Sequence, residues 1–321
     1  MSNQSQFLPD DLYLAVDGGG TSCKTRLYNA AGDVLGQGLA GASNARLGAE
    51  RVMKQIMKSV EQAFIDASVD FAHIKRTHAC FGLAGLELKR DQDNFYALEH
   101  SFKSVTLETD AVTACIGAFA GAEGAIVITG TGSSAVAIHQ QTIHNIGGWG
   151  FEISDSGSGA AVGRHAVRYA LRAAEGLEPS SPLTQYIMDF FNNDMGDIVL
   201  WAERAEPKDF AIFCAKAFDL YEVGDAAAIL LIERHMRELT QLIDGIMAFG
   251  SEQFTLLGGL ADRSAALLPA RLKAQYVAYQ NDALYGCFLR ITKHLSGSRV
   301  QVPQKFQNSA SVLVQKASSH V

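Results

Sequence analysis

Apolar residues fall into short runs at the start of the chain, and turn residues separate these runs. The segments LYLAVD, KTRLYNA and VLGQGLA, within residues 12–40, predict three strands, with the turn AAGD between the second and the third. Residues 48–67 then place apolar side chains on one stripe at helical spacing, which predicts an amphipathic helix. Two further apolar runs, at 77–86 and 104–110, predict buried strands, and a helix is expected directly after Asp110.

The order of strand, glycine-rich turn, strand, turn and strand occurs a second time in residues 124–150. When these residues are laid over the opening of the chain, Gly130 falls on Gly18 and Ser133 falls on Thr21. Because the turn and its flanking strands share one offset, the pattern predicts a duplicated structural unit.

Helical periodicity dominates the second half of the chain. The elements expected there are helices near 157–175, 208–221, 225–248, 263–273 and 281–295, and strands at 254–259 and 276–279. We expect two domains, 1–120 and 121–321, with the helix near 281–295 as a candidate to pack back onto the first. The tail from Ser296 is polar and is expected to be a loosely held terminus.

Composition and charge narrow the classes of function. The 321 residues carry a net charge of −7 and form no basic stripe, which argues against nucleic acid as a partner. Five cysteines lie far apart without a C-x-x-C pair, which favours free thiols in a reducing cytosol over a zinc site or a disulfide framework. The sequence contains no leader pattern and no apolar run long enough to span a bilayer, so we expect a cytoplasmic protein that does not insert in a membrane.

The segment DGGGTSCKT, at residues 17–25, joins the first two predicted strands. Its glycines allow positive φ and close approach of the backbone to a ligand, and successive N–H groups in such a turn form an anion site. Neither the spacing of a P-loop nor that of a dinucleotide-binding G-x-G-x-x-G helix start occurs here. The alternative is a tight turn whose glycines serve only the local geometry.

Two later segments extend the pattern. TGTGSS (129–134) occupies the same place in the second unit, and LLGGLAD (256–262) ends a predicted buried strand with two glycines. Three such segments in one chain favour binding of a nucleotide phosphate and nucleoside over three unrelated tight turns.

In this order, DGGGTSCKT, TGTGS and LLGGL resemble the phosphate-1, phosphate-2 and adenosine motifs of the actin, hexokinase and heat-shock ATPase superfamily. The segments GASNARLG, ETDA and GGWGFEISDSGSG are similar to those of the N-acetylglucosamine kinases and the bacterial glucosamine kinases. The grouping also holds the ATPases that activate benzoyl-CoA reductase. The resemblance implies a two-domain α/β fold of the ribonuclease H type, with duplicated β-β-β-α-β-α-β-α units and a cleft for ATP and sugar.

The resemblance also implies the residues that bind the sugar. In that family the acid at the position of Asp110 is the catalytic base, although Asp110 would also suit a helix N-cap. Asn44 matches a sugar-binding Asn, although an Asn in a loop is commonly a turn former. Trp149 would stack on the sugar or act as a core aromatic residue, and Asp155 matches a ligand for a second hydroxyl. The other residues expected at the substrate are Ser133, Ser134, Gly148 and Gly150.

The cofactors implied are ATP and Mg²⁺. The resemblance assigns the nucleotide to Gly19, Gly20, Thr21, Thr131, Gly132, Gly258 and Gly259. Asp17 is the expected metal-linked acid, although in this fold phosphates and water hold most of the ion. Lys24 either neutralises phosphate charge or points outward from the second strand.

One position departs from the family pattern. Vertebrate-type enzymes carry Asn directly after GTGS, where this chain has Ser134, so the acceptor remains open between N-acetylglucosamine and glucosamine. The expected function is ATP-dependent phosphorylation of the 6-hydroxyl of the amino sugar, by an enzyme that related kinases suggest is a homodimer. The alternative is an ATPase that activates a radical enzyme through a shared iron–sulfur cluster, for which Cys80 and Cys115 would be the candidate ligands.

Overall fold

The computed structural model describes residues 11–292 and 298–300. These residues form two compact units. The first holds residues 11–124, Gln140–Ile143, 278–292 and Ser298, and the second holds Ala125–His139, His144–Val277 and 299–300. Each unit contains one five-stranded sheet, which confirms the predicted α/β fold with two mixed sheets.

The first sheet has the order β3-β2-β1-β4-β5. Its strands are β1 (Leu12–Gly18), β2 (Cys23–Tyr28), β3 (Val34–Ala40), β4 (Thr77–Leu83) and β5 (Ser104–Thr109). Strands β1 and β2 and strands β2 and β3 are antiparallel, whereas β1, β4 and β5 are parallel. The carboxyl ends of three strands therefore lie at one edge of this sheet.

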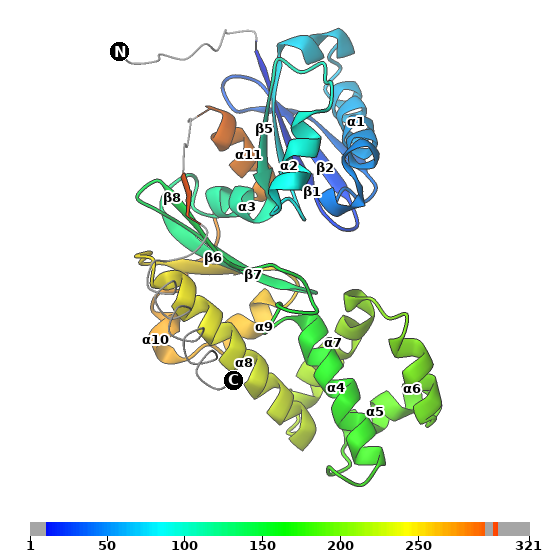
Figure 1. The fold of residues 1–321 in the computed structure, drawn as a ribbon. Helices are drawn as coiled ribbons and strands as arrows, with labels where there is room; N and C mark the ends of the chain where they lie inside the picture. Colours follow the sequence, from blue (N-terminus) through cyan, green and yellow to red (C-terminus); the bar gives the residue numbers. More distant parts are fainter. Residues whose placement is uncertain (1–10, 293–297, 301–321) are drawn as a thin grey trace, which may run out of the picture. The chain divides into compact units, whose positions relative to one another are not determined.

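Helices cover both faces of the first sheet (Figure 1). They are α1 (Ala49–Asp66), α2 (Lys89–Tyr96), α3 (Asp110–Ala118) and α11 (Ala283–Thr292), with short 3₁₀ turns at Ala45–Leu47 and Phe71–Arg76. The predicted apolar stripe of α1 is buried against alternate residues of β1, as its helical period requires. Helix α11 packs on α3, β1 and β4, on the other face. Residues 293–295 of the predicted last helix, and the tail after residue 300, lie outside the described residues.

The second sheet has the order β10-β8-β7-β6-β9. Its strands are β6 (Gly124–Thr129), β7 (Ser133–His139), β8 (Thr142–Gly147), β9 (Phe254–Leu257) and β10 (Ser298–Val300). The order β8-β7-β6-β9, with β6 and β9 parallel, repeats β3-β2-β1-β4 of the first sheet. The repeat does not extend to the fifth strand, because β10 lies beside β8 rather than beyond β9.

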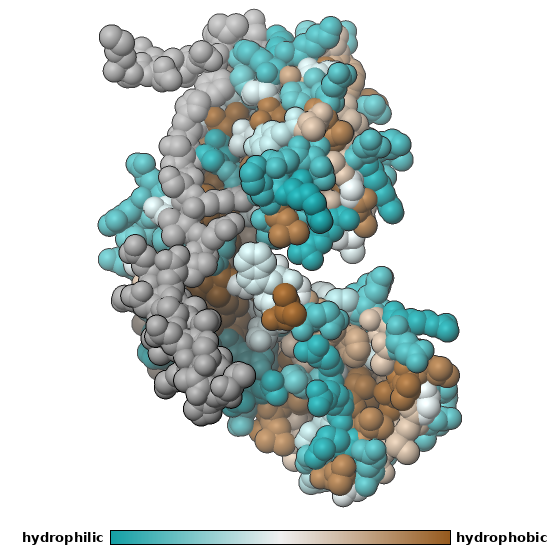
Figure 2. Space-filling view, viewed as in Figure 1, coloured by the Kyte–Doolittle hydropathy of each residue, from teal (hydrophilic) through white to brown (hydrophobic). Residues whose placement is uncertain are grey.

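Helices make up most of the second unit. They are α4 (Gly159–Ala174), α5 (Pro182–Phe190), α6 (Met195–Ala202), α7 (Pro207–Glu222), α8 (Ala226–Met247), α9 (Ala261–Ala266) and α10 (Ala270–Lys273). One face of α8 packs on the sheet through Leu239, Ile243 and Ile246, so its apolar positions serve the core. Figure 2 shows apolar side chains gathered over α5 and α6, where Val199 and Leu200 are more than half exposed. Within the described residues, no helix has the length and apolar character needed to cross a bilayer.

Two predicted elements differ from the structure, and two helices were not predicted. The strand expected at 276–279 is reduced to an isolated bridge between Tyr276 and Phe254. The helix expected at 263–273 is two short helices, because Pro269 cannot continue the first of them. Helices α5 and α6 were not predicted, although Ser181 and Pro182 give α5 a capping box and a proline in its first turn.

A buried ion pair attaches α11 to the first sheet. Arg290 donates to Oε1 of Glu108 in β5 at 2.7 and 2.8 Å, and the Glu108 side chain is only 6% exposed. Removal of one partner of a buried pair leaves an uncompensated charge, which costs more than the loss of an exposed pair.

We expect Arg290→Met to lower the free energy of unfolding by about 3 kcal/mol, because Glu108 stays buried without this cation. The matched control is Arg271→Met, which removes a pair with Asp244 whose side chains are 56% and 47% exposed. It should cost at most about 1 kcal/mol. Urea unfolding of both variants measures the difference, and equal effects would contradict the anchoring role of Arg290.

Candidate active site

Three carboxylate-bearing segments meet at the carboxyl ends of the parallel strands of the first unit. Asp17 is the penultimate residue of β1, Glu87 follows β4, and Asp110 follows β5. The connecting loops are fastened to one another here, since Ala84 donates its N–H to the carbonyl of Gly18 at 2.8 Å. Ligands of open α/β sheets bind outside such strand ends.

Asp110 is the first residue of α3 and is held by its own helix. Its Oδ1 accepts the N–H of Ala111 at 2.8 Å. The N-cap is Thr109, whose hydroxyl accepts the N–H of Val112 at 3.3 Å, so the N-cap prediction for Asp110 was wrong by one residue. Burial, with smaller contributions from the charges of Asp17 and Glu87, raises the pKa of Asp110 to about 6, although the hydrogen bond from Ala111 opposes the shift. A carboxylate of this kind is basic enough to accept a proton near neutral pH.

Asp17 lies opposite Lys24 in the β1–β2 ladder, so the two side chains share one face of the sheet. Burial raises the pKa of Asp17, Lys24 opposes this shift, and Asp282 adds to it. Arg26 binds Asp282 through two hydrogen bonds of 2.7 and 3.1 Å. Burial raises the pKa of Asp282, but Arg26, the N–H of Tyr285 and the charge of Lys24 together lower it below its ordinary value. In the part of the chain that the structure describes, no three His, Cys, Asp or Glu side chains are grouped to hold a metal ion.

Asn44 lies in the loop before α1, against the loop that follows β4. Its Oδ1 accepts the N–H of Arg46 at 3.0 Å, so the turn-forming role is confirmed, and the amide Nδ2 and one lone pair of Oδ1 are left for another partner. Gly85 has φ +78°, and a Cβ there would collide with Oδ1 of Asn44. Glycine at this position therefore allows the two loops to touch.

The first glycine turn is closed by a hydrogen bond of 2.9 Å from the N–H of Gly19 to the carbonyl of Ser22. Neither Gly19 nor Gly20 has positive φ, so the first of the two expected reasons for these glycines was wrong. A Cβ at Gly20 would meet no atom within 4 Å. No described residue accepts a hydrogen bond from the N–H groups of Gly20 and Thr21, which are exposed. Two successive exposed N–H groups without acceptors suit an anion.

The second glycine turn, in the second unit, has the same property. The N–H of Gly130 binds the carbonyl of Gly132 at 3.0 Å, and the first two residues of α4 donate to the carbonyls of Gly130 and Thr131. The N–H groups of Thr131 and Gly132 have no acceptor among the described residues. The N-terminal end of α4, a helix of 16 residues, is thus held beside two amides that suit an anion.

Asp155 lies over this second turn. Its backbone has φ +60°, a conformation that costs a residue other than glycine about 1 kcal/mol or more. A Cβ at Gly132 would approach Oδ2 of Asp155 to 2.9 Å, so glycine leaves room for the carboxylate. The neighbouring GGWG loop is fixed by a 3.2 Å hydrogen bond from Gly148 to Ser133. Trp149 is 51% exposed, so the core alternative for this residue was wrong.

The sequence did not reveal Glu238 of α8 as a support for this loop. Its Oε2 accepts the N–H of Gly157 at 2.8 Å, and the hydroxyl of Thr129 donates to the carbonyl of Gly157 at 3.1 Å. Arg234 binds the other Glu238 oxygen at 2.8 Å. Asp155 therefore lies two residues before Gly157, whose N–H and carbonyl are both held by hydrogen bonds.

The remaining predicted residues have different surroundings. Gly258 and Gly259 are exposed at the end of β9, and Gly258 has φ +102°. Ser133 donates its hydroxyl to the carbonyl of Ser156 at 2.7 Å, so this hydroxyl already serves the loop, whereas Ser134 is partly exposed.

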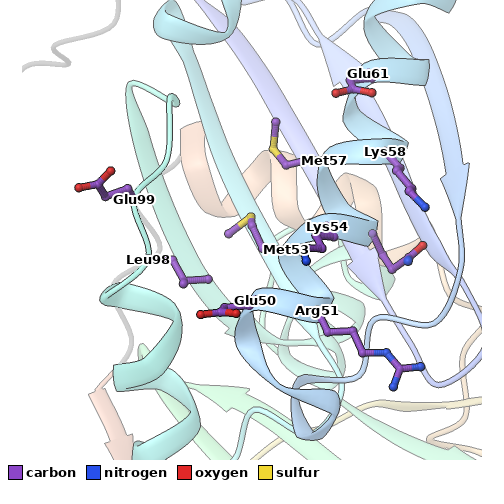
Figure 3. A pocket seen from close by; sticks show the side chains of 10 residues that line it. Glu50, Arg51, Met53, Lys54, Met57, Lys58, Glu61, Leu98 and Glu99 are labelled. Atoms are coloured by element: carbon purple, nitrogen blue, oxygen red, sulfur yellow. The ribbon is translucent and has the colours of Figure 1, made fainter.

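A surface pocket of about 650 Å³ lies along α1, away from these residues in the chain (Figure 3). Met53, Met57 and Leu98 form its apolar part, and charged side chains of α1 surround them. None of the predicted sugar or nucleotide residues lines this pocket, so it is a separate feature.

The chain matches the BadF/BadG/BcrA/BcrD ATPase family over residues 14–283. It is 34% identical to the glucosamine kinase GspK of Vibrio cholerae, over 86% of this chain and 94% of that protein. It is 23% identical to the N-acetyl-D-glucosamine kinase of Dictyostelium discoideum, over 74% of this chain and 79% of that protein.

Among solved structures, a protein of Chromobacterium violaceum assigned provisionally as an N-acetylglucosamine kinase superposes with a TM-score of 0.80. The two chains are 28% identical, over 87% of this chain and 98% of the other. These similarities confirm the predicted family and fold, and they confirm the predicted enzyme class, a phosphotransferase.

The raised pKa of Asp110 determines whether its charge stabilises or destabilises the folded state. The folded state holds this proton more tightly than the unfolded chain, so stability falls as pH rises from 3.8 to about 6 and stays lower above it. Asp110→Asn should therefore stabilise the protein, by up to about 3 kcal/mol at pH 8 and by less at pH 5. Denaturation at both pH values measures this, with the exposed Glu222→Gln as control. A destabilised Asp110→Asn at pH 8 would contradict the burial of this charge.

Proposed function

Because the chain belongs to the BadF/BadG/BcrA/BcrD ATPase family, we propose that it transfers the γ-phosphoryl group of ATP to the 6-hydroxyl of an amino sugar. The acceptor is N-acetylglucosamine or glucosamine, the substrates named for its relatives. One observation carries the proposal. A buried carboxylate with a pKa of about 6 lies at the same strand ends as a glycine turn with two amides that have no acceptor.

In the proposed reaction Asp110 accepts the proton of the sugar 6-hydroxyl. The bond from O6 to the γ-phosphorus forms, the bond to the β–γ bridging oxygen breaks, and ADP leaves with that electron pair. The pKa of Asp110 leaves it mostly ionised at pH 7, yet still able to take up a proton. Burial and Oδ1 bonding to Ala111 keep its carboxylate in one orientation.

The amides of Gly20 and Thr21, and those of Thr131 and Gly132, bind phosphate oxygens in this proposal. Their lack of acceptors among the described residues fits an anion. Mg²⁺ would neutralise phosphate charge, and Asp17 would be the carboxylate that holds it, with phosphate and water as further ligands. Lys24 adds positive charge on the same face as Asp17. A Cβ at Gly259 would meet no atom within 4 Å, so the backbone there is open to the nucleoside, whereas a Cβ at Gly258 would collide with the carbonyl of Thr129.

The proposal assigns the following contacts to the sugar. Asn44 offers Nδ2 as a donor to a hydroxyl, and its Oδ1, already bonded to Arg46, has one lone pair left. Asp155 offers a carboxylate whose backbone is held in a strained conformation, as ligand-binding residues commonly are. Trp149, with Gly148 and Gly150 beside it, presents an exposed ring that suits the apolar face of a pyranose. Ser134 lies beside Gly148 and is the position that departs from the family pattern.

The remaining expectations belong to the same proposal. The division into 1–120 and 121–321 would give the base to the first domain and the adenosine motif to the second. All five cysteines are free and buried, which supports a reducing, cytoplasmic location. A homodimer is expected from the related kinases, and light scattering at working concentration measures it.

The alternative is an ATPase that activates a radical enzyme and shares an iron–sulfur cluster with a second subunit. Its candidate ligands, Cys80 and Cys115, are both fully buried, and Cys80 interacts with Cys287. Neither thiol is placed on a surface that a second subunit could reach, so the structure favours the kinase.

A coupled assay of ADP release tests the proposed function. With ATP and Mg²⁺, we expect turnover to depend on N-acetylglucosamine or glucosamine and to be low with glucose or without sugar. Asp110→Asn should reduce sugar-dependent turnover by about a hundredfold or more, because the base is lost. Glu222→Gln, an exposed charge removal, should keep it. ATP hydrolysis that is independent of sugar, and unchanged in Asp110→Asn, would support the ATPase instead.

A further inference from the structure

Glu87 lies in the corner that holds both Asn44 and Asp110, and no role has been given to it. It follows β4, two residues after Gly85, the glycine that allows contact with Asn44. Its side chain is 27% exposed, yet its Oε2 is buried and forms no hydrogen bond. A buried carboxylate oxygen without a donor is costly unless a ligand supplies one.

The neighbours of Glu87 leave negative charge in this corner. The ion-pair partner of Glu87 among the described residues is Arg46. Its Nη2 is 3.7 Å from Oε2, beyond hydrogen-bond distance, and its side chain is 49% exposed. Asp17 and Glu87 both act on Asp110 as like charges. Lys24 faces Asp17 across the strand pair, so it compensates Asp17 rather than Glu87. A cationic ligand group beside Glu87 would relieve this repulsion.

We propose that Glu87 is a specificity-determining residue that pairs with the protonated 2-amino group of glucosamine. This inference rests on the proposed function, since it assigns the acceptor of that reaction. The amino group of glucosamine is a cation when protonated, whereas the N-acetyl group is neutral and the hydroxyl of glucose at the same carbon is neutral. All three groups can donate a hydrogen bond to the Glu87 carboxylate, but only the ammonium forms an ion pair with it and offsets the charge on Asp110.

The test compares kcat/KM for glucosamine, N-acetylglucosamine and glucose in the wild type, Glu87→Gln and the exposed control Glu99→Gln. We expect Glu87→Gln to reduce the ratio of glucosamine to glucose by about tenfold or more, because an ion pair between the ammonium and a carboxylate becomes a hydrogen bond to a neutral amide. The value for glucose should change by less than about threefold. Glu99→Gln should leave all three values unchanged.

Other outcomes would overturn the inference. An equal loss for all three sugars in Glu87→Gln would mean that Glu87 only supports the loop, and no change would mean that it does not face the sugar. Arg46→Gln removes the competing cation and should raise the ratio of glucosamine to glucose. A fall in that ratio would contradict a role based on charge.

Calorimetric binding separates failure of this inference from failure of the proposed function. Glucosamine that binds the wild type more tightly than Glu87→Gln, without sugar-dependent turnover, would overturn the kinase but keep the pairing. If the protein phosphorylates sugars but binds glucosamine no more tightly than glucose, the proposed kinase function stands and the proposed pairing of Glu87 with glucosamine is overturned.

The pH profile adds a measurement that a purely structural role would not change. With glucose, which does not titrate, the acid limb of kcat/KM reports Asp110 in the free enzyme. Removal of the charge at Glu87 should move this limb to lower pH, because Glu87 raises the pKa of Asp110. An acid limb that stays in place in Glu87→Gln would contradict the electrostatic contact.

Discussion

The first unit depends on the meeting of three parallel strand ends, which brings Asp17, Glu87 and Asp110 into one partly buried corner. Like charges in such a place destabilise one another, and burial adds to the cost. Hydrogen bonds that fix the loops around the corner help to offset this cost, as does the bond from the N–H of Ala84 to the carbonyl of Gly18. The result is a carboxylate, Asp110, with the proton affinity that a base needs near neutral pH.

The two units build their glycine turns in the same way. Each begins with antiparallel strands joined by a glycine turn, and each turn leaves two successive amides without an acceptor among the described residues. Positive φ does not explain the glycines of the first turn, whereas Gly132 in the second turn makes room for Asp155. Repetition of one unit thus gives two similar turns, and the proposed function assigns both to phosphate.

Local patterns predicted the elements that position the candidate site. The predictions of a strand ending near Asp110 and of an amphipathic α1 were correct, because in both segments the spacing of apolar residues matches the residues that the fold buries. The predictions failed where contacts between residues far apart in the chain determine the structure. The strand expected near Tyr276 keeps only one bridge, because the second sheet ends at β9 on that side.

Side-chain roles were harder to predict than elements. Asn44 caps its own turn, and the cap of α3 is one residue earlier than expected, because each depends on which oxygen faces which amide. Glu238 was missed because it meets Gly157 from a helix far along the chain. Glu87 was missed because a charged residue after an apolar run is usually exposed, although its place after a parallel strand pointed to the site.

The most direct measurement for this account is the titration of Asp110 in the unliganded protein. Carbon-13 NMR of labelled aspartate carboxyls would follow it, with its signal identified by its loss in Asp110→Asn. The account predicts a midpoint near pH 6, from burial beside Asp17 and Glu87. A midpoint near 4, the value of an ordinary exposed aspartate, would contradict it.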